Sequence, residues 1–162
     1  MVIYVDTREQ NPFFYDKMDH PEFPDLELKT VTLKTGDYSI QGMSDPSDGP
    51  SITIERKNPS DLFGSMGQGR ERFEREIIRM SKFTYAALVL ETDFSGMFTN
   101  PPELTRMLPK SVFRSIIAFS MRWGIHCFPC PDRSFAEKTT YLILKRFWDD
   151  RQPDGKFYFN NI

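Results

Sequence analysis

The hexapeptide ITIERK, residues 52–57, is the stretch of sequence from which the fold prediction starts. β-Branched residues dominate its first half, which is typical of a strand. Successive side chains of a strand point to opposite faces of the sheet, so Ile54 and Arg56 share one face while Glu55 and Lys57 share the other. We therefore expect one face of this strand to pack against a core and the other to carry chemistry.

Short apolar runs on either side of this segment predict further strands. The cluster QGMSDPSDGPS, residues 41–51, is rich in turn residues, and we expect it to join two antiparallel strands. The predicted strands are residues 2–5, 26–33, 38–40, 52–57, 85–90 and 125–128.

Apolar residues at helical spacing predict helices after the first strands. One helix is expected to start at Asn58–Asp61, and others at residues 70–82, 110–123 and 134–149. A β-rich first third followed by alternating helix and strand indicates an α/β sheet with helices on its faces. We expect one domain over residues 1–150 and a tail over residues 151–162.

The composition excludes several classes of protein. Of the 162 residues, 39% are hydrophobic and 27% are charged, which is near the globular average and argues against disorder. A formal net charge of -2 argues against binding nucleic acid by bulk electrostatics, so any DNA contact has to be local.

The sequence also predicts a location inside the cell. No apolar run approaches the roughly 20 residues of a membrane span, and residues 1–10, MVIYVDTREQ, lack the features of a secretory signal. The two cysteines, Cys127 and Cys130, are too few for a disulfide framework. We expect an intracellular protein of the cytoplasm, nucleoid or nucleus, of cellular or viral origin, without membrane association.

Charged residues gather at the ends of the predicted strands, where side chains from distant parts of a chain converge. The clusters are Asp6, Arg8 and Glu9; Asp37 after Gly36; and Glu55, Arg56 and Lys57 with Asp61 beyond. Two carboxylates that meet in one cleft repel each other by about 4 kcal/mol at an effective dielectric of 20. A divalent cation removes that penalty.

Asp37 and Glu55 suit Mg²⁺, which prefers oxygen ligands and is usually held by one or two carboxylates together with substrate phosphate. Lys57 shares a strand face with Glu55, so its ammonium can orient an attacking water and offset charge in the transition state. The residues themselves thus indicate a site that hydrolyses phosphodiesters.

Three motifs in this order resemble the XPF-type structure-specific nucleases of the PD-(D/E)XK superfamily. They are VDTRE at residues 5–9, LKTGDYSI at 33–40 and ITIERKNPSDLFGSMGQGRERFEREIIRM at 52–80. The hallmark is Gly-Asp, then Glu-Arg-Lys, then Asp four residues after the lysine. Glycine stands where the superfamily has the proline of its PD motif, in agreement with the XPF-type pattern. The resemblance runs from Val2 to about Asp149.

The resemblance implies a restriction-endonuclease-like α/β fold, with a central mixed β-sheet flanked by α-helices on both faces. It also implies a DNA endonuclease that uses Mg²⁺ or Mn²⁺. The implied metal ligands are Asp37, Glu55 and the backbone carbonyl of Arg56, with Asp6 as a further candidate. Lys57 would aid the water, and Asp6, Glu9 and Asp61 would complete the catalytic set.

The expected partners follow from the same reasoning. DNA is expected to be structured or branched, with Arg8, Arg56, Arg70 and Arg72 as contacts, and the chain to form a homodimer or heteromer through the helices at 110–149. The tandem helix-hairpin-helix module that often follows such domains is absent from these residues, so we expect a separate DNA-binding partner.

Several features keep a second interpretation open. Arg8 pairs with a nearby carboxylate as readily as it contacts phosphate. GSMGQGRERF, residues 64–73, lacks the end of a Walker A motif, and we interpret it as a loop that DNA approaches or as a solvated helix face.

A zinc site at His126, Cys127 and Cys130 is a weak hypothesis. Residues 93–109 are expected to be a loop, either a cover near the cleft or a dimer contact. The aromatic residues Phe157–Phe159 are expected to dock on the domain's own core.

Two rival functions share this sequence pattern. One is a DNA-binding or scaffold subunit with a nuclease fold and weak turnover. The other is a nuclease of the same superfamily that cuts duplex DNA, for example at a defined sequence. Intact Asp37, Glu55 and Lys57 argue against the scaffold.

Overall fold

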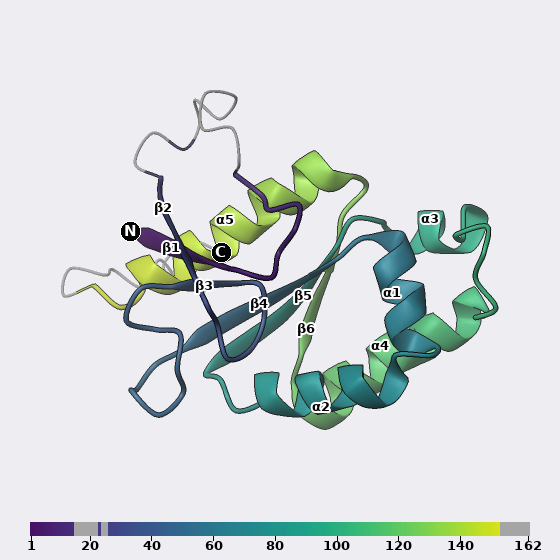
Figure 1. Ribbon diagram of the computed structural model, residues 1–162, viewed down its shortest axis with the longest axis horizontal. Helices are drawn as coiled ribbons and strands as arrows, with labels where there is room; N and C mark the ends of the chain where they lie inside the picture. Colours follow the sequence, from purple (N-terminus) through teal and green to yellow (C-terminus); the bar gives the residue numbers. More distant parts are fainter. Residues whose placement is uncertain (15–22, 24–25, 153–162) are drawn as a thin grey trace, which may run out of the picture.

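A computed structural model describes residues 1–14, 23 and 26–152 of the chain. Within them lies one six-stranded sheet with the order β2-β1-β3-β4-β5-β6 (Figure 1). The strands are β1 (Val2–Asp6), β2 (Glu27–Val31), β3 (Tyr38–Ile40), β4 (Ile52–Lys57), β5 (Tyr85–Leu90) and β6 (His126–Pro129). The helices are α1 (Pro59–Met66), α2 (Arg70–Met80), α3 (Phe94–Thr99), α4 (Pro109–Trp123) and α5 (Arg133–Asp149).

The sheet is mixed, as predicted. β3 is antiparallel to both of its neighbours, β1 and β4, while the pairs β1·β2, β4·β5 and β5·β6 are parallel. The carboxyl ends of β1, β4 and β5 therefore lie at the same end of the sheet. Since β3 runs the other way, its amino end, next to Asp37, lies at that end too.

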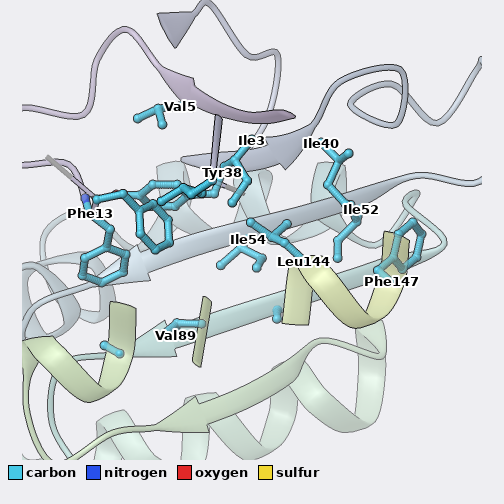
Figure 2. Packing of buried hydrophobic residues seen from close by; sticks show 14 of the residues in the cluster. Ile3, Val5, Phe13, Tyr38, Ile40, Ile52, Ile54, Val89, Leu144 and Phe147 are labelled. Atoms are coloured by element: carbon cyan, nitrogen blue, oxygen red, sulfur yellow. The ribbon is translucent and has the colours of Figure 1, made fainter. Parts of the chain in front are cut away.

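Helices cover both faces of the sheet, which confirms the predicted architecture (Figure 1). On one face, α5 packs through Ala136, Leu144 and Phe147 against the strands, as Figure 2 shows for Ile54, Val89 and Leu144. On the other face, α1, α2 and α4 pack through a second core that includes Leu62, Ile77 and Ile116. β4 lies between the two cores, so each of its faces meets a different environment.

Most predicted elements have the expected type, with small shifts of their ends. The predicted strand at 26–33 is shorter, because beyond β2 the backbone N–H of Leu33 donates to the Asp6 carboxylate at 2.7 Å. The segment 64–73 was interpreted as a loop or as a solvated helix face, and each interpretation fits one part of it. Residues 64–66 are the last turn of α1, and residues 70–73 already belong to α2.

The loop expected at 93–109 is wrong for its first part. Residues 94–99 form α3, with Asp93 as the N-cap, whose carboxylate accepts the N–H of Gly96 at 2.5 Å. Met97 anchors this short helix because its side chain is buried in the second core. The spacing of apolar residues is too short here to reveal a helix of 6 residues.

Other expectations meet the structure only in part. Burial raises the pKa of the Cys127 thiol to about 12, which disfavours a thiolate ligand, and both cysteines are free thiols. The aromatic residues Phe157–Phe159 lie outside the described residues. In the part of the chain that the structure describes, no helix combines the length and apolar character needed to cross a bilayer.

Candidate active site

A pocket of about 430 Å³ opens where β1, β4 and the turn before β3 meet α1 and α2. It contains most of the residues predicted from sequence: Asp6, Arg8, Asp37, Glu55, Lys57, Asp61 and Arg72. The structure thus brings together acids that are up to 55 positions apart, from Asp6 to Asp61.

Glu55 and Lys57 form the centre of this pocket. They project from the same face of β4, and the Lys57 Nζ lies 2.6 Å from Glu55 Oε1. The Lys57 side chain is 15% exposed and lies over the ring of Phe73, 5.0 Å from its centroid. Burial alone would lower the pKa of Lys57, but the charge and hydrogen bond of Glu55 raise it above its usual value. The ammonium is therefore charged at neutral pH.

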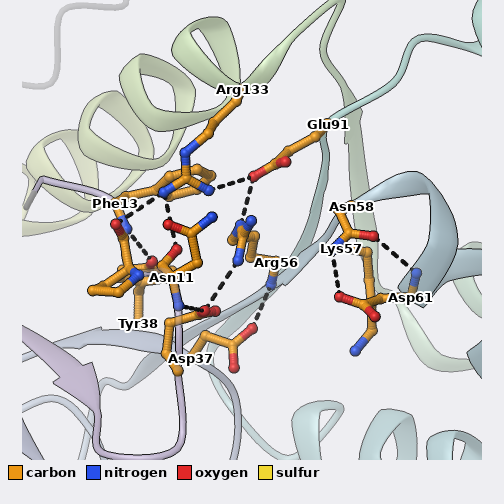
Figure 3. Close-up of polar contacts among 12 residues, drawn as sticks. Asn11, Phe13, Asp37, Tyr38, Arg56, Lys57, Asn58, Asp61, Glu91 and Arg133 are labelled. Carbon is orange, nitrogen blue, oxygen red and sulfur yellow. Dashed lines mark hydrogen bonds and ion pairs between the residues drawn. The ribbon is translucent and has the colours of Figure 1, made fainter.

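Asp37 reaches the pocket because Gly36 makes a turn that other residues cannot make. Gly36 has a φ of +75°, and a Cβ there would lie 2.1 Å from Thr53 Oγ1. Beyond the turn, the N–H of Asp37 donates to the carbonyl of Ile54 at 2.8 Å. The N–H of Arg56 in turn donates to Asp37 Oδ2 at 2.8 Å (Figure 3). Backbone contacts with β4 thus fix the direction of the carboxylate.

The surroundings of both central carboxylates disfavour their charged forms. Burial and the nearby charge of Glu55 raise the pKa of Asp37 well above its usual value. Burial also raises the pKa of Glu55, against the opposing effect of Lys57. The lysine supplies one positive charge beside these two acids, so a further cation near them is favourable.

The oxygen donors of this pocket fit Mg²⁺ or Mn²⁺. Such ions keep several waters and need only one or two protein carboxylates. No group of three or more His, Cys, Asp and Glu side chains with the geometry of a metal site occurs in the described residues, which include His126 and both cysteines. The fit of an ion therefore rests on Asp37 and Glu55, and this choice of ligands stays a prediction.

Asp6 and Arg8 form a separate ion pair at the wall of the pocket. Asp6 accepts hydrogen bonds from Arg8 Nε at 2.7 Å and from the N–H groups of Arg8 and Leu33, both at 2.7 Å. The Arg8 side chain also donates to the carbonyl of Leu33 at 2.8 Å. Arg8 thus pairs with Asp6, and this pair joins the end of β1 to the segment that leads into the Gly36 turn.

Arg56 and Glu9 lie outside the pocket, on the opposite face of β4. The Arg56 guanidinium, whose side chain is 7% exposed, lies 3.0 Å from Glu9 and 2.6 Å from Glu91 (Figure 3). Arg133 at the start of α5 contacts the same Glu91 at 3.0 Å. Both guanidinium groups also lie near the ring of Phe13, at 5.1 and 4.9 Å. We call Glu9, Arg56, Glu91 and Arg133 the back-face network.

Asp61 and Arg70 have local partners. Asn58 caps α1, and its amide group binds Asp61 through the Asp61 N–H at 2.9 Å and the carboxylate at 2.6 Å. Arg70 donates to Ser115 Oγ at 3.0 Å and pairs with Glu74 at 2.8 Å, so it connects α2 with α4 rather than lining the pocket.

Three residues of this region were not predicted from sequence. Glu76 lines the pocket and accepts the N–H of Gly36 at 3.1 Å. It follows Arg72 by one helical turn, so helical spacing could have revealed it. Glu91 directly follows β5 and its N–H donates to the carbonyl of Lys57, so its position at a strand end was also a signal. Arg133 lies 42 positions after Glu91 in the sequence, and no local sequence pattern indicated it.

The mixed sheet, with two acids and a lysine clustered where β4 meets the Gly36 turn, defines a domain of the restriction-endonuclease-like fold. The family model of the ERCC4 domain matches residues 5–143. The chain therefore belongs to the ERCC4 domain family, which confirms the resemblance to XPF-type nucleases.

Solved structures agree with this assignment of the fold. XPF from Aeropyrum pernix has a TM-score of 0.62 with 21% sequence identity, over 91% of this chain and 63% of that chain. The complex of Aeropyrum pernix XPF with DNA gives a TM-score of 0.62 and 22% identity, over 90% of this chain and 62% of that chain. This chain thus spans less than two thirds of the length of those proteins. No curated protein sequence matches it.

Proposed function

We propose that this domain is a metal-dependent DNA endonuclease that hydrolyses phosphodiester bonds in branched or otherwise structured DNA. The observation that carries the proposal is the arrangement of Asp37, Glu55 and Lys57 in one pocket, with Glu55 buried, Asp37 partly buried and the lysine 2.6 Å from Glu55. Membership of the ERCC4 domain family supports it.

Each side chain has a role that its surroundings support. Asp37, Glu55 and the backbone carbonyl of Arg56 would hold Mg²⁺ or Mn²⁺, with Asp6 as a weaker candidate because Arg8 already neutralises it. When bound, the ion supplies Lewis acidity and positive charge at the scissile phosphate. Lys57 remains protonated, orients the water that attacks phosphorus and offsets the charge of the transition state.

DNA is proposed as the substrate because one of the similar structures is a complex with DNA. Arg72 lines the pocket and is proposed to contact a phosphate of the substrate. Arg8 is bound to Asp6 but lies at the pocket wall with its side chain 64% exposed, so it is a second candidate. Arg56 is buried in the back-face network, and we propose a positioning role for its side chain.

An assembly is proposed on the basis of exposed apolar residues. Ile117 and Met121 lie one helical turn apart on α4 and are both exposed. Such a stripe is typical of a helix that pairs with another surface. A second copy of this chain or a related subunit is the proposed partner, and a separate protein is proposed to supply further grip on branched DNA.

A cleavage assay tests the proposed function against its rivals. The purified chain is incubated with labelled single-stranded, duplex, flap and fork DNA in Mg²⁺, Mn²⁺ or chelator. We expect metal-dependent cutting of the branched substrates in preference to the others. Cutting of duplex alone would favour the duplex-specific nuclease, and binding without any cutting would favour the scaffold.

A further inference from the structure

A second cavity adjoins the candidate active site. It has a volume of about 1250 Å³ and lies between α1 and the segment that links α3 to α4, residues 100–108. In Figure 1 this segment forms the right-hand edge of the molecule. Ser60, Gly64 and Gly69 line both cavities, so the second cavity lies next to the pocket that holds Glu55 and Lys57. Pockets for small ligands measure roughly 300–1,000 Å³, so this volume suits a segment of a polymer better.

Gly64 forms the shared floor of the two cavities, and the fold does not require a glycine there. It lies inside α1, where glycine costs up to about a kilocalorie per mole relative to alanine. A Cβ at this position would meet no atom within 4 Å, so no packing reason explains the missing side chain. Gly67 differs, because a Cβ there would lie 3.0 Å from the Met107 side chain. A glycine that the helix does not need is typical of a surface that another backbone approaches closely.

The opposite wall of the second cavity combines apolar and basic side chains. Leu104 lines it and is 98% exposed. Met107 adds to the apolar lining on this wall, and Phe63 adds to it from α1. Arg106 also lines the cavity and supplies a cation, while Glu103 contributes an opposing charge. Apolar side chains pack against the faces of nucleobases only where the bases are unstacked, because stacked bases hide their faces from the protein.

We propose that this second cavity binds unpaired nucleotides of the DNA strand next to the scissile phosphate. The proposal rests on the proposed nuclease function and names the part of the DNA substrate that the domain recognises. The strand crosses α1 over Gly64, its bases pack against Leu104, and its phosphates lie near Arg72 on one side and Arg106 on the other. Recognition of structured DNA then resides in this domain, in addition to any partner protein.

Binding measured without cleavage tests the proposal. Fluorescence anisotropy of the complete chain in chelator compares a duplex that carries a single-stranded arm with the blunt duplex of the same sequence. We expect wild type to prefer the armed duplex, and Leu104→Ala to weaken binding of that DNA by at least about fivefold. Binding of the blunt duplex is expected to be unchanged. 2-Aminopurine in the arm reports the base contact, and its fluorescence change on binding is expected to decrease in Leu104→Ala.

A matched control and a second variant separate binding from folding. Leu142 on α5 is also an exposed leucine, at 61%, but lies away from both cavities, so Leu142→Ala is expected to bind like wild type. Gly64→Ala is expected to raise the Tm, because alanine favours the helix, and yet to weaken binding of the armed duplex. Equal affinity of wild type and Leu104→Ala for the armed duplex, or an equal loss on the blunt duplex, would overturn the proposal.

The outcome is independent of catalysis. If Lys57→Ala cut DNA as fast as wild type while Leu104→Ala lost only its affinity for the armed duplex, the proposed catalytic site would fail and this inference would stand. The reverse pattern, with Lys57→Ala inactive and Leu104→Ala unchanged in binding, would reject the inference alone.

Discussion

The backbone N–H of Arg56 donates a hydrogen bond to Asp37 at 2.8 Å, while the guanidinium of the same residue lies between Glu9 and Glu91 on the other face of β4. One residue thus connects the candidate active site with the back-face network. Because the guanidinium is held by carboxylates on both sides, β4 cannot shift without breaking buried ion pairs. The position of Asp37 therefore depends on a network that does not touch the pocket.

Loss of one member of the back-face network is expected to destabilise the fold strongly. Arg56→Met leaves the carboxylates of Glu9 and Glu91, which are both largely buried, without their main cation. Removing one partner of a buried ion pair costs about 3–5 kcal/mol. Urea denaturation is expected to show a loss of this order. The pair of Lys145 and Asp149, whose side chains are 41% and 48% exposed, supplies the control, since Lys145→Met is expected to cost less than about 1 kcal/mol. Equal losses in both variants would contradict the account.

Asp37→Asn is expected to stabilise the protein in the absence of metal. Burial and Glu55 raise the pKa of Asp37, so its charged form is unfavourable in the folded chain, and asparagine removes that charge while still accepting the Arg56 N–H. We expect a gain of about 0.5–2 kcal/mol in chelator, measured by thermal or urea unfolding. Asp48→Asn, an exposed carboxylate outside the pocket, is expected to change little. A destabilised Asp37→Asn would argue against repulsion between the two acids.

Added Mg²⁺ or Mn²⁺ is expected to raise the Tm of the wild type, because a ligand that binds only the folded state stabilises it. Asp37→Asn is expected to lose this response while Asp48→Asn keeps it. The concentration dependence of Tm measures it directly. An equal rise in wild type and Asp37→Asn would place the ion elsewhere.

Gly36→Ala is expected to destabilise the fold by at least about 1–3 kcal/mol. The position has a φ of +75°, and the added Cβ would lie 2.1 Å from Thr53 Oγ1. Gly42 has a φ of +77° but nothing lies within 4 Å of its Cβ position, so Gly42→Ala isolates the cost of the backbone conformation. Denaturation of both variants separates clash from conformation. If Gly36→Ala lost no more stability than Gly42→Ala, the Thr53 side chain would have to move and accommodate the added Cβ.

Asp6 is expected to contribute to the loss of stability in acid. Burial alone would raise its pKa, but hydrogen bonds from Arg8 and Leu33 hold the pKa below the usual 3.8. A depressed carboxyl pKa stabilises the fold above the unfolded-state pKa, and this contribution disappears as pH falls through the folded-state value. The stability difference between wild type and Asp6→Asn is therefore expected to shrink as pH is lowered through about 4 and below. A difference that stays constant with pH would contradict this assignment.

The sequence revealed those parts of the molecule that depend on local patterns. The alternation in ITIERK predicted that Glu55 and Lys57 share a face, and the apolar runs predicted β5 and β6, because each strand is specified by its own residues. The spacing of the motifs likewise predicted that Asp37 lies at the same site. Such features need no knowledge of what packs against them.

Other features depend on distant residues and were not predicted. The alternation placed Arg56 on the face opposite Glu55, but its contacts there with Glu91 and Phe13 were not predicted, and it was expected to contact DNA instead. Arg133 joins the same network from α5, across the sheet from α1 and α2. The second cavity also escaped prediction, since only tertiary packing brings residues 102–107 beside α1.

The cleavage rate of Lys57→Ala at saturating Mn²⁺, measured together with Mn²⁺ binding, tests the central claim most directly. Asp37 and Glu55 remain in this variant, so it is expected to bind Mn²⁺ and the branched DNA while cutting at least about a hundredfold more slowly than wild type. A variant that binds both and cuts at the wild-type rate would contradict the assignment of this pocket as the catalytic site.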